Sequence, residues 1–323
     1  MSNKQQANLL EVRGLTVDYL TEKAKARALE NVSFKVAQGS ILGIVGESGC
    51  GKTTLMLALL RLLPQAGRIV AGEVLFNGRD LLRLSENDMR SLRWQDLAII
   101  FQGAMNALNP VKTVEDQITE VLLRQNPNKT SAAKRVDELL EMVGIGRNRK
   151  GQYPHQFSGG MRQRAMIAMA LACNPKLVIA DEPTTALDVM VQAQILELLL
   201  QLRAELDLTI LLVTHDLGVV AEVCDTALVM YGGVIAEHAP IDAIFNAPSH
   251  PYTQALLGAF PDHTKPKTQL LSIPGYPPKL DALPPGCRFA PRCSQVIDIC
   301  QLKTPSLIKV SDGFASCHLL ETL

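Results

Sequence analysis

Residues 46–54 are Gly46-Glu47-Ser48-Gly49-Cys50-Gly51-Lys52-Thr53-Thr54, and they match the pattern G-x-x-x-x-G-K-T. The short apolar run Ile41–Val45 precedes them and is typical of a buried strand, while residues 54–60 have the composition of a helix. A strand, a glycine-rich loop and a helix in this order direct unpaired backbone N–H groups and a helix N-terminus at phosphate oxygens. The sequence therefore predicts a site for the phosphates of a nucleotide.

The residue types in this loop suit that chemistry. Glycine at three positions lets the backbone approach a ligand closely and adopt angles that a side chain would forbid. Lys52 would place a positive charge on the outer phosphates, and the Thr53 hydroxyl would bind Mg²⁺, which bridges to phosphate oxygens. The loop residues that we expect to contact the nucleotide are Gly46, Ser48, Gly49, Cys50, Gly51, Lys52, Thr53 and Thr54.

The composition excludes several classes of protein. Lys and Arg total 32 residues, Asp and Glu also total 32, and aromatic residues make up 4%, so neither charge nor stacking side chains favour nucleic-acid binding. A hydrophobic fraction of 47% in 323 residues allows one large or two ordinary domains with a core. The chain lacks an apolar run long enough for a transmembrane helix, and residues 1–6 lack the apolar core of a signal peptide. We therefore expect a cytosolic chain whose cysteines are thiols or metal ligands.

Predicted strands alternate with predicted helices along most of the chain. Residues 9–19 are expected to form an edge strand and residues 28–36 a second strand of the same kind, and Asn77-Gly78 predicts a hairpin turn. This alternation predicts an α/β fold with a mostly parallel sheet and helices on both faces. Further strands are expected at 73–76, 98–101, 177–180 and 209–213, and helices at 114–123, 132–143, 158–173 and 189–206.

Acidic and imidazole side chains follow two of these strands, at the carboxyl ends where such sheets place their sites. Asp181 and Glu182 come directly after the strand at 177–180, and His215 follows the strand at 209–213. Asp181 would hold Mg²⁺ through water, and Glu182 would polarise the water that attacks the γ-phosphate. The alternative is an ordinary solvated strand end, but the phosphate loop upstream favours a nucleotide hydrolysis site.

The composition changes after Ala239. Twelve of the 18 prolines and four of the seven cysteines lie beyond it, together with a predicted helix at 252–260. This segment is expected to be a separate small module or an extended tail, and not more sheet.

Five motifs in one order resemble the ATP-hydrolysing subunits of ABC transporters. The segment Ser158-Gly159-Gly160-Met161-Arg162-Gln163-Arg164 is similar to the signature motif of that family, and Gln102 is similar to its Q-loop glutamine. Asp188, at the end of Thr185-Ala186-Leu187-Asp188, resembles the D-loop aspartate, and His215 resembles the switch histidine. With the phosphate loop they follow the family's order, and the resemblance covers roughly residues 9–245.

The resemblance implies a fold and a mechanism. The fold would be a P-loop NTPase core with an antiparallel β-subdomain and an inserted helical subdomain at about 103–163, within a nucleotide-binding domain at 1–245. Two subunits would meet head to tail, with ATP between the phosphate loop of one and the signature motif of the other. Glu182, His215 and Gln102 would be catalytic, Gln102 would also contact Mg²⁺, and Tyr19 would stack on adenine unless it is an ordinary strand tyrosine. The residues that would act on the partner's nucleotide are Ser158, Gly159, Gly160, Gln163 and Asp188.

The C-terminal segment is similar to that of the oligopeptide and dipeptide importer ATPases. The resemblance rests on His250-Pro251-Tyr252-Thr253, on Ile273-Pro274-Gly275 and on the cysteines near the end. It implies a C-terminal extension at 246–323, two membrane permease subunits, a second and related ATPase subunit, an extracytoplasmic binding protein, and a place at the cytoplasmic face of the plasma membrane. Nickel importers share this architecture. Soluble ABC ATPases usually carry two cassettes in one chain or a long coiled-coil insertion. They are disfavoured here, because this sequence has one cassette and no sustained heptads.

Four cysteines in this extension could hold a metal. Cys287, Cys293, Cys300 and Cys317 are separated by 5, 6 and 16 residues, and no C-x-x-C occurs, so a zinc ribbon is a poor match. Four thiolates can hold a [4Fe–4S] cluster, and the resemblance to the importer ATPases implies that cluster. Zinc bound by four cysteines and four reduced structural thiols are the alternatives.

Overall fold

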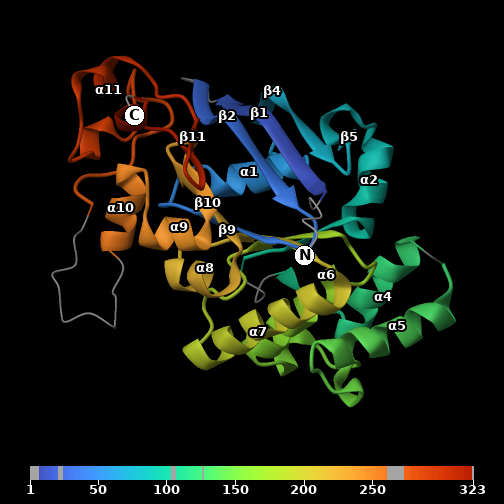
Figure 1. The fold of residues 1–323 in the computed structure, drawn as a ribbon. Helices are drawn as coiled ribbons and strands as arrows, with labels where there is room; N and C mark the ends of the chain where they lie inside the picture. Colours follow the sequence, from blue (N-terminus) through green and yellow to red (C-terminus); the bar gives the residue numbers. More distant parts are fainter. Residues whose placement is uncertain (1–6, 21–24, 103–106, 126, 260–272, 322–323) are drawn as a thin grey trace. The chain divides into compact units, whose positions relative to one another are not determined.

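The computed structural model describes residues 7–20, 25–102, 107–125, 127–259 and 273–321 (Figure 1). The chain forms two compact units. The first comprises residues 1–37, 41–82 and 213–323, and the second comprises residues 38–40 and 83–212. The phosphate loop and the C-terminal extension therefore belong to the first unit, while Asp181, Glu182 and the signature motif belong to the second.

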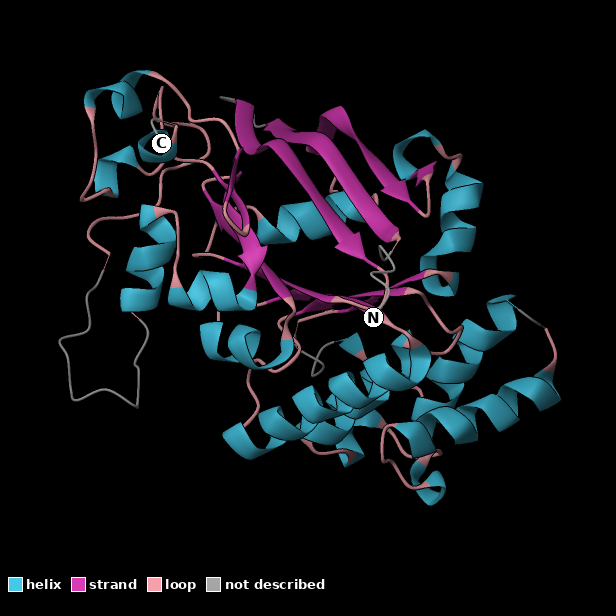
Figure 2. Cartoon of the chain, viewed as in Figure 1, coloured by secondary structure: helices cyan, strands magenta, loops and turns pink. Residues whose placement is uncertain are grey.

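The first unit contains the predicted antiparallel β-subdomain. Its strands are β1 (Asn8–Leu20), β2 (Lys25–Ala37), β4 (Gly67–Phe76) and β5 (Arg79–Asp80), in the spatial order β2-β1-β4-β5 (Figure 2). The turn at Asn77-Gly78 joins β4 to β5, and both residues have the positive φ values, 48° and 78°, that a tight hairpin requires. The prediction that residues 9–19 form an edge strand is wrong, because β1 pairs with β2 on one side and with β4 on the other. The pairing of β1 with β2 is irregular between Val12 and Leu15, where the register shifts.

The first unit also builds part of a second sheet. Strand β3 (Ile41–Val45) pairs in parallel with β9 (Thr226–Tyr231), which pairs antiparallel with β10 (Val234–Pro240). The C-terminal strands β11 (Ile308–Val310) and β12 (Gly313–Ala315) continue this sheet, since β12 pairs with both β10 and β11. The expectation that the extension adds no strands is therefore wrong. Strands β11 and β12 have only three residues each, which is too few to show an alternating pattern. The backbone of β12 also lies close to that of β10, because a Cβ at Gly313 would lie 2.3 Å from the His238 carbonyl oxygen.

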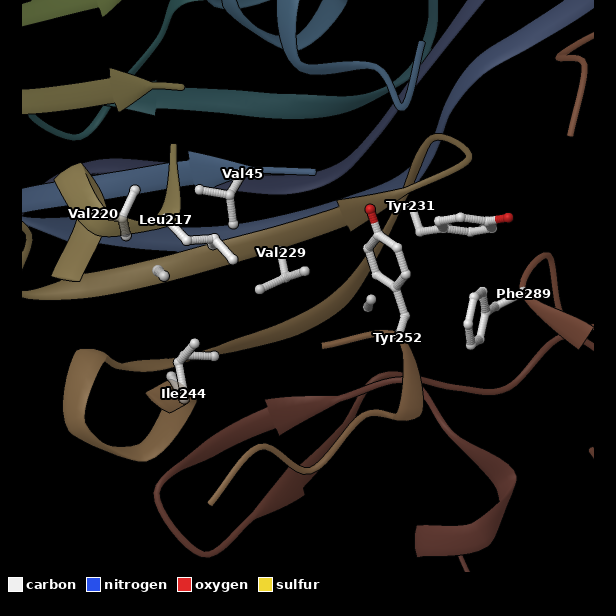
Figure 3. Close-up of a cluster of buried hydrophobic side chains, with 11 residues drawn as sticks. Val45, Leu217, Val220, Val229, Tyr231, Ile244, Tyr252 and Phe289 are labelled. Atoms are coloured by element: carbon white, nitrogen blue, oxygen red, sulfur yellow. The ribbon is translucent and has the colours of Figure 1, made fainter. Parts of the chain in front are cut away.

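The C-terminal extension shares its core with these strands. A buried cluster joins Val45 and Val229 of the sheet to Tyr252 and Phe289 of the extension, and Figure 3 shows Tyr231, Tyr252 and Phe289 grouped together. Tyr252 lies on α10, which matches the helix expected at 252–260; residue 260 itself lies outside the described residues. The helices of this unit are α1 (Lys52–Leu59), α8 (Leu217–Val223), α9 (Ile241–Asn246), α10 (Pro251–Gly258) and α11 (Asp298–Leu302).

The second unit contains three neighbouring strands, β8 (Thr209–Val213), β7 (Leu177–Asp181) and β6 (Leu97–Ile100), and β6 and β7 are parallel. The last residue of β8, Val213, is already part of the first unit. Helices α4, α5 and α6 contact one another. The helical subdomain at about 103–163 stays a prediction, and residues 103–106 lie outside the described part. None of the helices described here is both long and apolar enough to cross a membrane. In the part of this unit that the structure describes, the α-helices are α2 (Glu86–Gln95), α4 (Val114–Gln125), α5 (Lys129–Met142), α6 (Gly159–Ala170) and α7 (Val189–Leu206).

Candidate active site

The phosphate loop has a backbone that only glycine allows at two positions. Gly46 has a φ of 149°, and a Cβ there would lie 2.2 Å from the Met230 carbonyl oxygen. Gly51 has a φ of 106°, and a Cβ there would lie 2.9 Å from the Ala28 carbonyl oxygen. Helix α1 begins at Lys52, two residues earlier than expected, so its N-terminus lies within the loop. The strand, loop and helix thus form the arrangement predicted for binding phosphate.

Lys52 lies at the centre of this loop. Its side chain is buried, and Nζ donates hydrogen bonds to the carbonyl oxygens of Gly46 at 2.5 Å and of Glu47 at 3.1 Å. The ammonium is thereby fixed beside the backbone N–H groups that would face the outer phosphates. Ser48, Gly49 and Thr53 are exposed and Thr54 is half-buried, so these predicted contacts remain accessible.

The nucleotide contact of Cys50 stays a prediction, and the structure shows where its side chain lies. Its thiol is buried, 1% exposed, and its Sγ lies 3.7 Å from Lys52 Nζ. Burial raises the pKa of the Cys50 thiol above its usual value, despite the nearby ammonium. Because the side chain points into the protein, only the backbone of Cys50 is placed to contact a nucleotide.

Two further predicted residues lie near the loop in the first unit. Tyr19, at the end of β1, has its hydroxyl 3.5 Å from the Thr54 hydroxyl at the start of α1. His215 is exposed and follows Thr214, whose N–H donates to the Ile44 carbonyl oxygen at 3.2 Å. The chain that leads to His215 is therefore attached to the strand that precedes the phosphate loop.

The sequence reasoning missed two contacts to Glu47 in this loop. The Glu47 N–H donates to the Tyr252 hydroxyl at 3.0 Å, and the Glu47 carboxylate accepts two hydrogen bonds from Arg292, at 2.6 and 3.0 Å. Tyr252 lies in a motif that the sequence singled out, but only as a mark of the subgroup. No local pattern indicates Arg292.

In the second unit, the structure brings the predicted catalytic glutamate and the Q-loop glutamine together. Glu182 Oε2 accepts hydrogen bonds from Gln102 Nε2 at 2.6 Å and from the Thr185 hydroxyl at 2.9 Å. Glu182 has a φ of 45°, an uncommon value for a residue with a side chain and one that recurs at functional sites. Asp181, the last residue of β7, is buried beside it in the chain.

The signature motif forms the N-terminus of α6. Ser158 is exposed and caps the helix, with its hydroxyl oxygen accepting the Met161 N–H at 3.3 Å. Gly160 allows close packing, because a Cβ there would lie 2.5 Å from Val191 Cγ1 of α7. Asp188 is also exposed, and it caps α7 by accepting the Val191 N–H at 2.9 Å. Ser158 and Asp188 are therefore available for contacts outside this unit.

Gln163, which was predicted to act on the partner's nucleotide, has a buried side chain. Its side chain is 3% exposed, and Nε2 has no hydrogen-bond partner within the described part of the chain. A partner's nucleotide could contact Gln163 only if this side chain were at the surface. The side chain instead has the position of a core residue.

The four C-terminal cysteines line one small cavity, together with His250 and His318. All four are free thiols, and burial raises the pKa of Cys287, Cys293 and Cys317. The Gln295 N–H lies 3.4 Å from Cys293 Sγ. Among the residues that the structure describes, no group of three or more His, Cys, Asp or Glu side chains is arranged to hold a metal ion. The four cysteines that were predicted to bind a metal therefore line one cavity, and the bound metal stays a prediction.

Two family models match the chain. The model described as ABC transporter matches residues 29–185, and the model described as oligopeptide/dipeptide transporter, C-terminal region, matches residues 236–300. A probable peptide ABC transporter ATP-binding protein of Sinorhizobium fredii, y4tR, is 48% identical over 322 residues, which cover 98% of this chain and 96% of that protein. The dipeptide transport ATP-binding protein DppD of Escherichia coli is 48% identical over 314 residues, which cover 96% of each protein.

Solved structures of ATP-binding cassettes have the same fold. A dimeric post-hydrolysis state of the cassette MJ0796 bound to ADP and Pi matches with a TM-score of 0.64 at 27% identity, over 72% of this chain and 98% of that chain. The protein cbiO1 of Clostridium perfringens, part of the ABC transporter complex cbiONQ, matches with a TM-score of 0.66 at 28% identity, over 74% of this chain and 91% of that chain. This chain therefore belongs to the ABC-transporter ATP-binding proteins, and its C-terminal region belongs to that of the oligopeptide and dipeptide transporters.

Proposed function

We propose that this chain hydrolyses ATP to power the import of dipeptides or oligopeptides through a membrane permease. The observation that supports this most directly is the combination, on one chain, of the Gln102–Glu182–Thr185 contacts with a C-terminal region of the oligopeptide and dipeptide transporter type. A nickel-type importer is the second candidate, because such importers share this architecture. A soluble, non-transport ABC ATPase is the third.

Each residue of the catalytic set has a role. The backbone N–H groups of residues 46–54 and Lys52 would bind the β- and γ-phosphates, and Tyr19 would stack on the adenine. Thr53, Asp181 and Gln102 would hold Mg²⁺, which neutralises charge on the phosphates. Glu182 would orient and deprotonate the attacking water, and His215 would stabilise charge on the γ-phosphate.

Hydrolysis would require a second ATPase subunit. The helix N-terminus at Ser158 is exposed and is an anion-binding feature, and following the family resemblance we assign it to the nucleotide of a partner subunit. The exposed Asp188 would act in the same interface. The partner would be a related ATPase subunit that packs head to tail, and the pair would serve two permease subunits at the cytoplasmic face of the inner membrane and, indirectly, an extracytoplasmic binding protein.

A pull-down from gently solubilised native membranes tests this assembly. Mass spectrometry should identify two polytopic permeases and a second ATPase with the tagged chain. The complex in proteoliposomes should then hydrolyse ATP faster with its binding protein and a dipeptide, and a Glu182→Gln complex should not respond. Stimulation by nickel alone would favour the second candidate. Ribosomal, DNA-repair or metabolic partners without permeases would contradict an import function.

For the four cysteines we propose metal binding, as a [4Fe–4S] cluster with zinc as the alternative. Their shared cavity and the N–H donor beside Cys293 Sγ support this proposal. The cavity measures about 10 Å³, so the thiols would have to move outward to admit a cluster. Anaerobically purified protein should contain iron and absorb broadly near 400 nm, with bleaching by dithionite. Colourless protein with equimolar zinc would favour the alternative, and protein without either metal would contradict both.

A further inference from the structure

Glu47 is the residue of the phosphate loop to which the C-terminal extension is attached. Its N–H donates to Tyr252 Oη at 3.0 Å, and its carboxylate binds Arg292 through Oε2–Nη1 and Oε1–Nη2 contacts of 2.6 and 3.0 Å. Its carbonyl oxygen accepts from Lys52 Nζ at 3.1 Å. One residue therefore joins the extension directly to the lysine that would bind the outer phosphates.

Contacts with β9, with β10 and within the extension hold Tyr252 in place. The buried Glu237 carboxylate accepts the N–H groups of Ser249 and His250, at 2.7 and 3.0 Å, and His250 Nδ1 accepts the Tyr252 N–H at 2.9 Å to cap α10. The Tyr252 side chain is fully buried, and its ring centroid lies 4.6 Å from that of Tyr231. Its hydroxyl is thereby fixed as an acceptor for the phosphate loop.

Arg292 is held as firmly. Its side chain is 5% exposed, its guanidinium lies 5.8 Å from the centroid of the Tyr231 ring, and Nε donates to the Pro274 carbonyl oxygen at 2.8 Å. The hydrogen bonds with Glu47 raise the pKa of Arg292 further above its usual value, so the guanidinium stays charged at all physiological pH values. Arg292 and Glu47 therefore form a paired, mostly desolvated contact with fixed geometry.

The charge of Glu47 explains why this contact matters for the nucleotide. Glu47 directly follows Gly46 in a loop built to receive phosphate groups, where a carboxylate without a counter-charge would repel them. Arg292 supplies that counter-charge and holds the carboxylate through two hydrogen bonds. We propose that Arg292 and Tyr252 are positioning residues for ATP binding, through which the C-terminal extension sets the conformation and the net charge of the phosphate loop.

The test is binding of ATP, ADP and adenosine to the full chain in a Glu182→Gln background, which prevents turnover. Arg292→Gln should weaken ATP binding by about tenfold or more, the loss of roughly one charge-assisted contact. The loss should be smaller for ADP and absent for adenosine, because the repulsion grows with the charge of the phosphates. Added salt should reduce the difference between ATP and ADP.

Three further variants separate positioning from folding. Glu47→Gln combined with Arg292→Gln should recover most of the ATP affinity, because the repelling charge is gone. Tyr252→Phe keeps the ring and removes only the acceptor for the Glu47 N–H, so it should weaken ATP binding without a large change in thermal stability. Arg13→Gln is the matched control, because Arg13 forms a similar two-bond pair with Glu11 elsewhere in the same unit, at 3.0 and 2.9 Å.

Two outcomes would overturn the proposal. One is wild-type ATP affinity in both Arg292→Gln and Tyr252→Phe. The other is an equal loss for ATP, ADP and adenosine that the double variant does not relieve, which would indicate a structural role only.

Discussion

Gln102 donates a hydrogen bond of 2.6 Å from its Nε2 to Oε2 of Glu182, a residue 80 positions later in the chain. The same carboxylate oxygen accepts the Thr185 hydroxyl at 2.9 Å. Two neutral donors therefore fix the direction of the carboxylate. A general base needs such a fixed position relative to the water from which it accepts a proton.

Glu182→Gln should bind ATP with the wild-type affinity and hydrolyse it more slowly by at least about 10²-fold, the contribution of a positioned general base. A fluorescent nucleotide measures binding, and phosphate release measures turnover. Gln102→Ala, which removes one donor to the carboxylate but leaves the carboxylate itself, should lower kcat less than Glu182→Gln does. Near-normal steady-state hydrolysis by Glu182→Gln would refute the catalytic role of Glu182.

The buried thiol of Cys50 should react slowly with maleimides at neutral pH. Burial raises its pKa, and the thiolate is the reactive form. Mass spectrometry of the folded protein should show labelling of Cys50 later than labelling of any cysteine with a half-exposed thiol, and denaturation should remove the difference. Cys50→Ser should bind ATP normally. Rapid labelling of Cys50 in the folded state would show that the loop opens readily.

The buried His250 should make the protein less stable as the pH falls from about 6.5 to about 4. Burial lowers the pKa of His250 to about 4, so the unfolded chain binds a proton in this range that the folded chain does not. Stability is complete above the unfolded pKa of about 6.5 and declines by on the order of 3 kcal/mol as the pH falls to 4.

The variant His250→Asn isolates this effect. Asparagine can accept the Tyr252 N–H as a helix cap but does not titrate in this range. Urea unfolding at several pH values should give a shallower decline for the variant, with the difference confined to pH 4–6.5. His238, whose pKa burial also lowers to about 4, is present in both proteins and cancels in the comparison. Equal slopes would show that His250 titrates normally.

Much of the site could be predicted from the sequence, because its parts are local motifs. A few consecutive residues are enough to form each part. These parts are the phosphate loop, the strand ending at Asp181, and the helix caps at Ser158 and Asp188. Helix α2 was missed although Ser85 caps it, accepting the Asp88 N–H at 3.2 Å, because its mostly polar residues show no apolar stripe. The contact of Arg292 with Glu47 joins residues 245 apart, and no local pattern indicates such a pairing.

The direction of a side chain within a motif could not be predicted from the sequence either. Cys50 and Gln163 occupy motif positions but point inward, since the motif fixes the backbone and the surrounding core decides where each side chain lies. Short strands such as β12 depend on the strand that they join rather than on their own residues.

Gly160 of the signature motif should be required for packing as well as for binding. A Cβ at this position would lie 2.5 Å from Val191 Cγ1, so Gly160→Ala should destabilise the protein by about 1–3 kcal/mol, the usual cost of overpacking. Gly159→Ala is a matched control in the same helix turn, because a Cβ there would meet Leu187 Cδ2 at an ordinary 3.4 Å. Thermal unfolding should give a lower melting temperature for Gly160→Ala than for Gly159→Ala. Adding Val191→Ala to Gly160→Ala should restore part of the lost stability. If both alanine variants are equally stable, the packing of α6 against α7 does not require a glycine at position 160. Gly160 would then serve only to bind the partner's nucleotide.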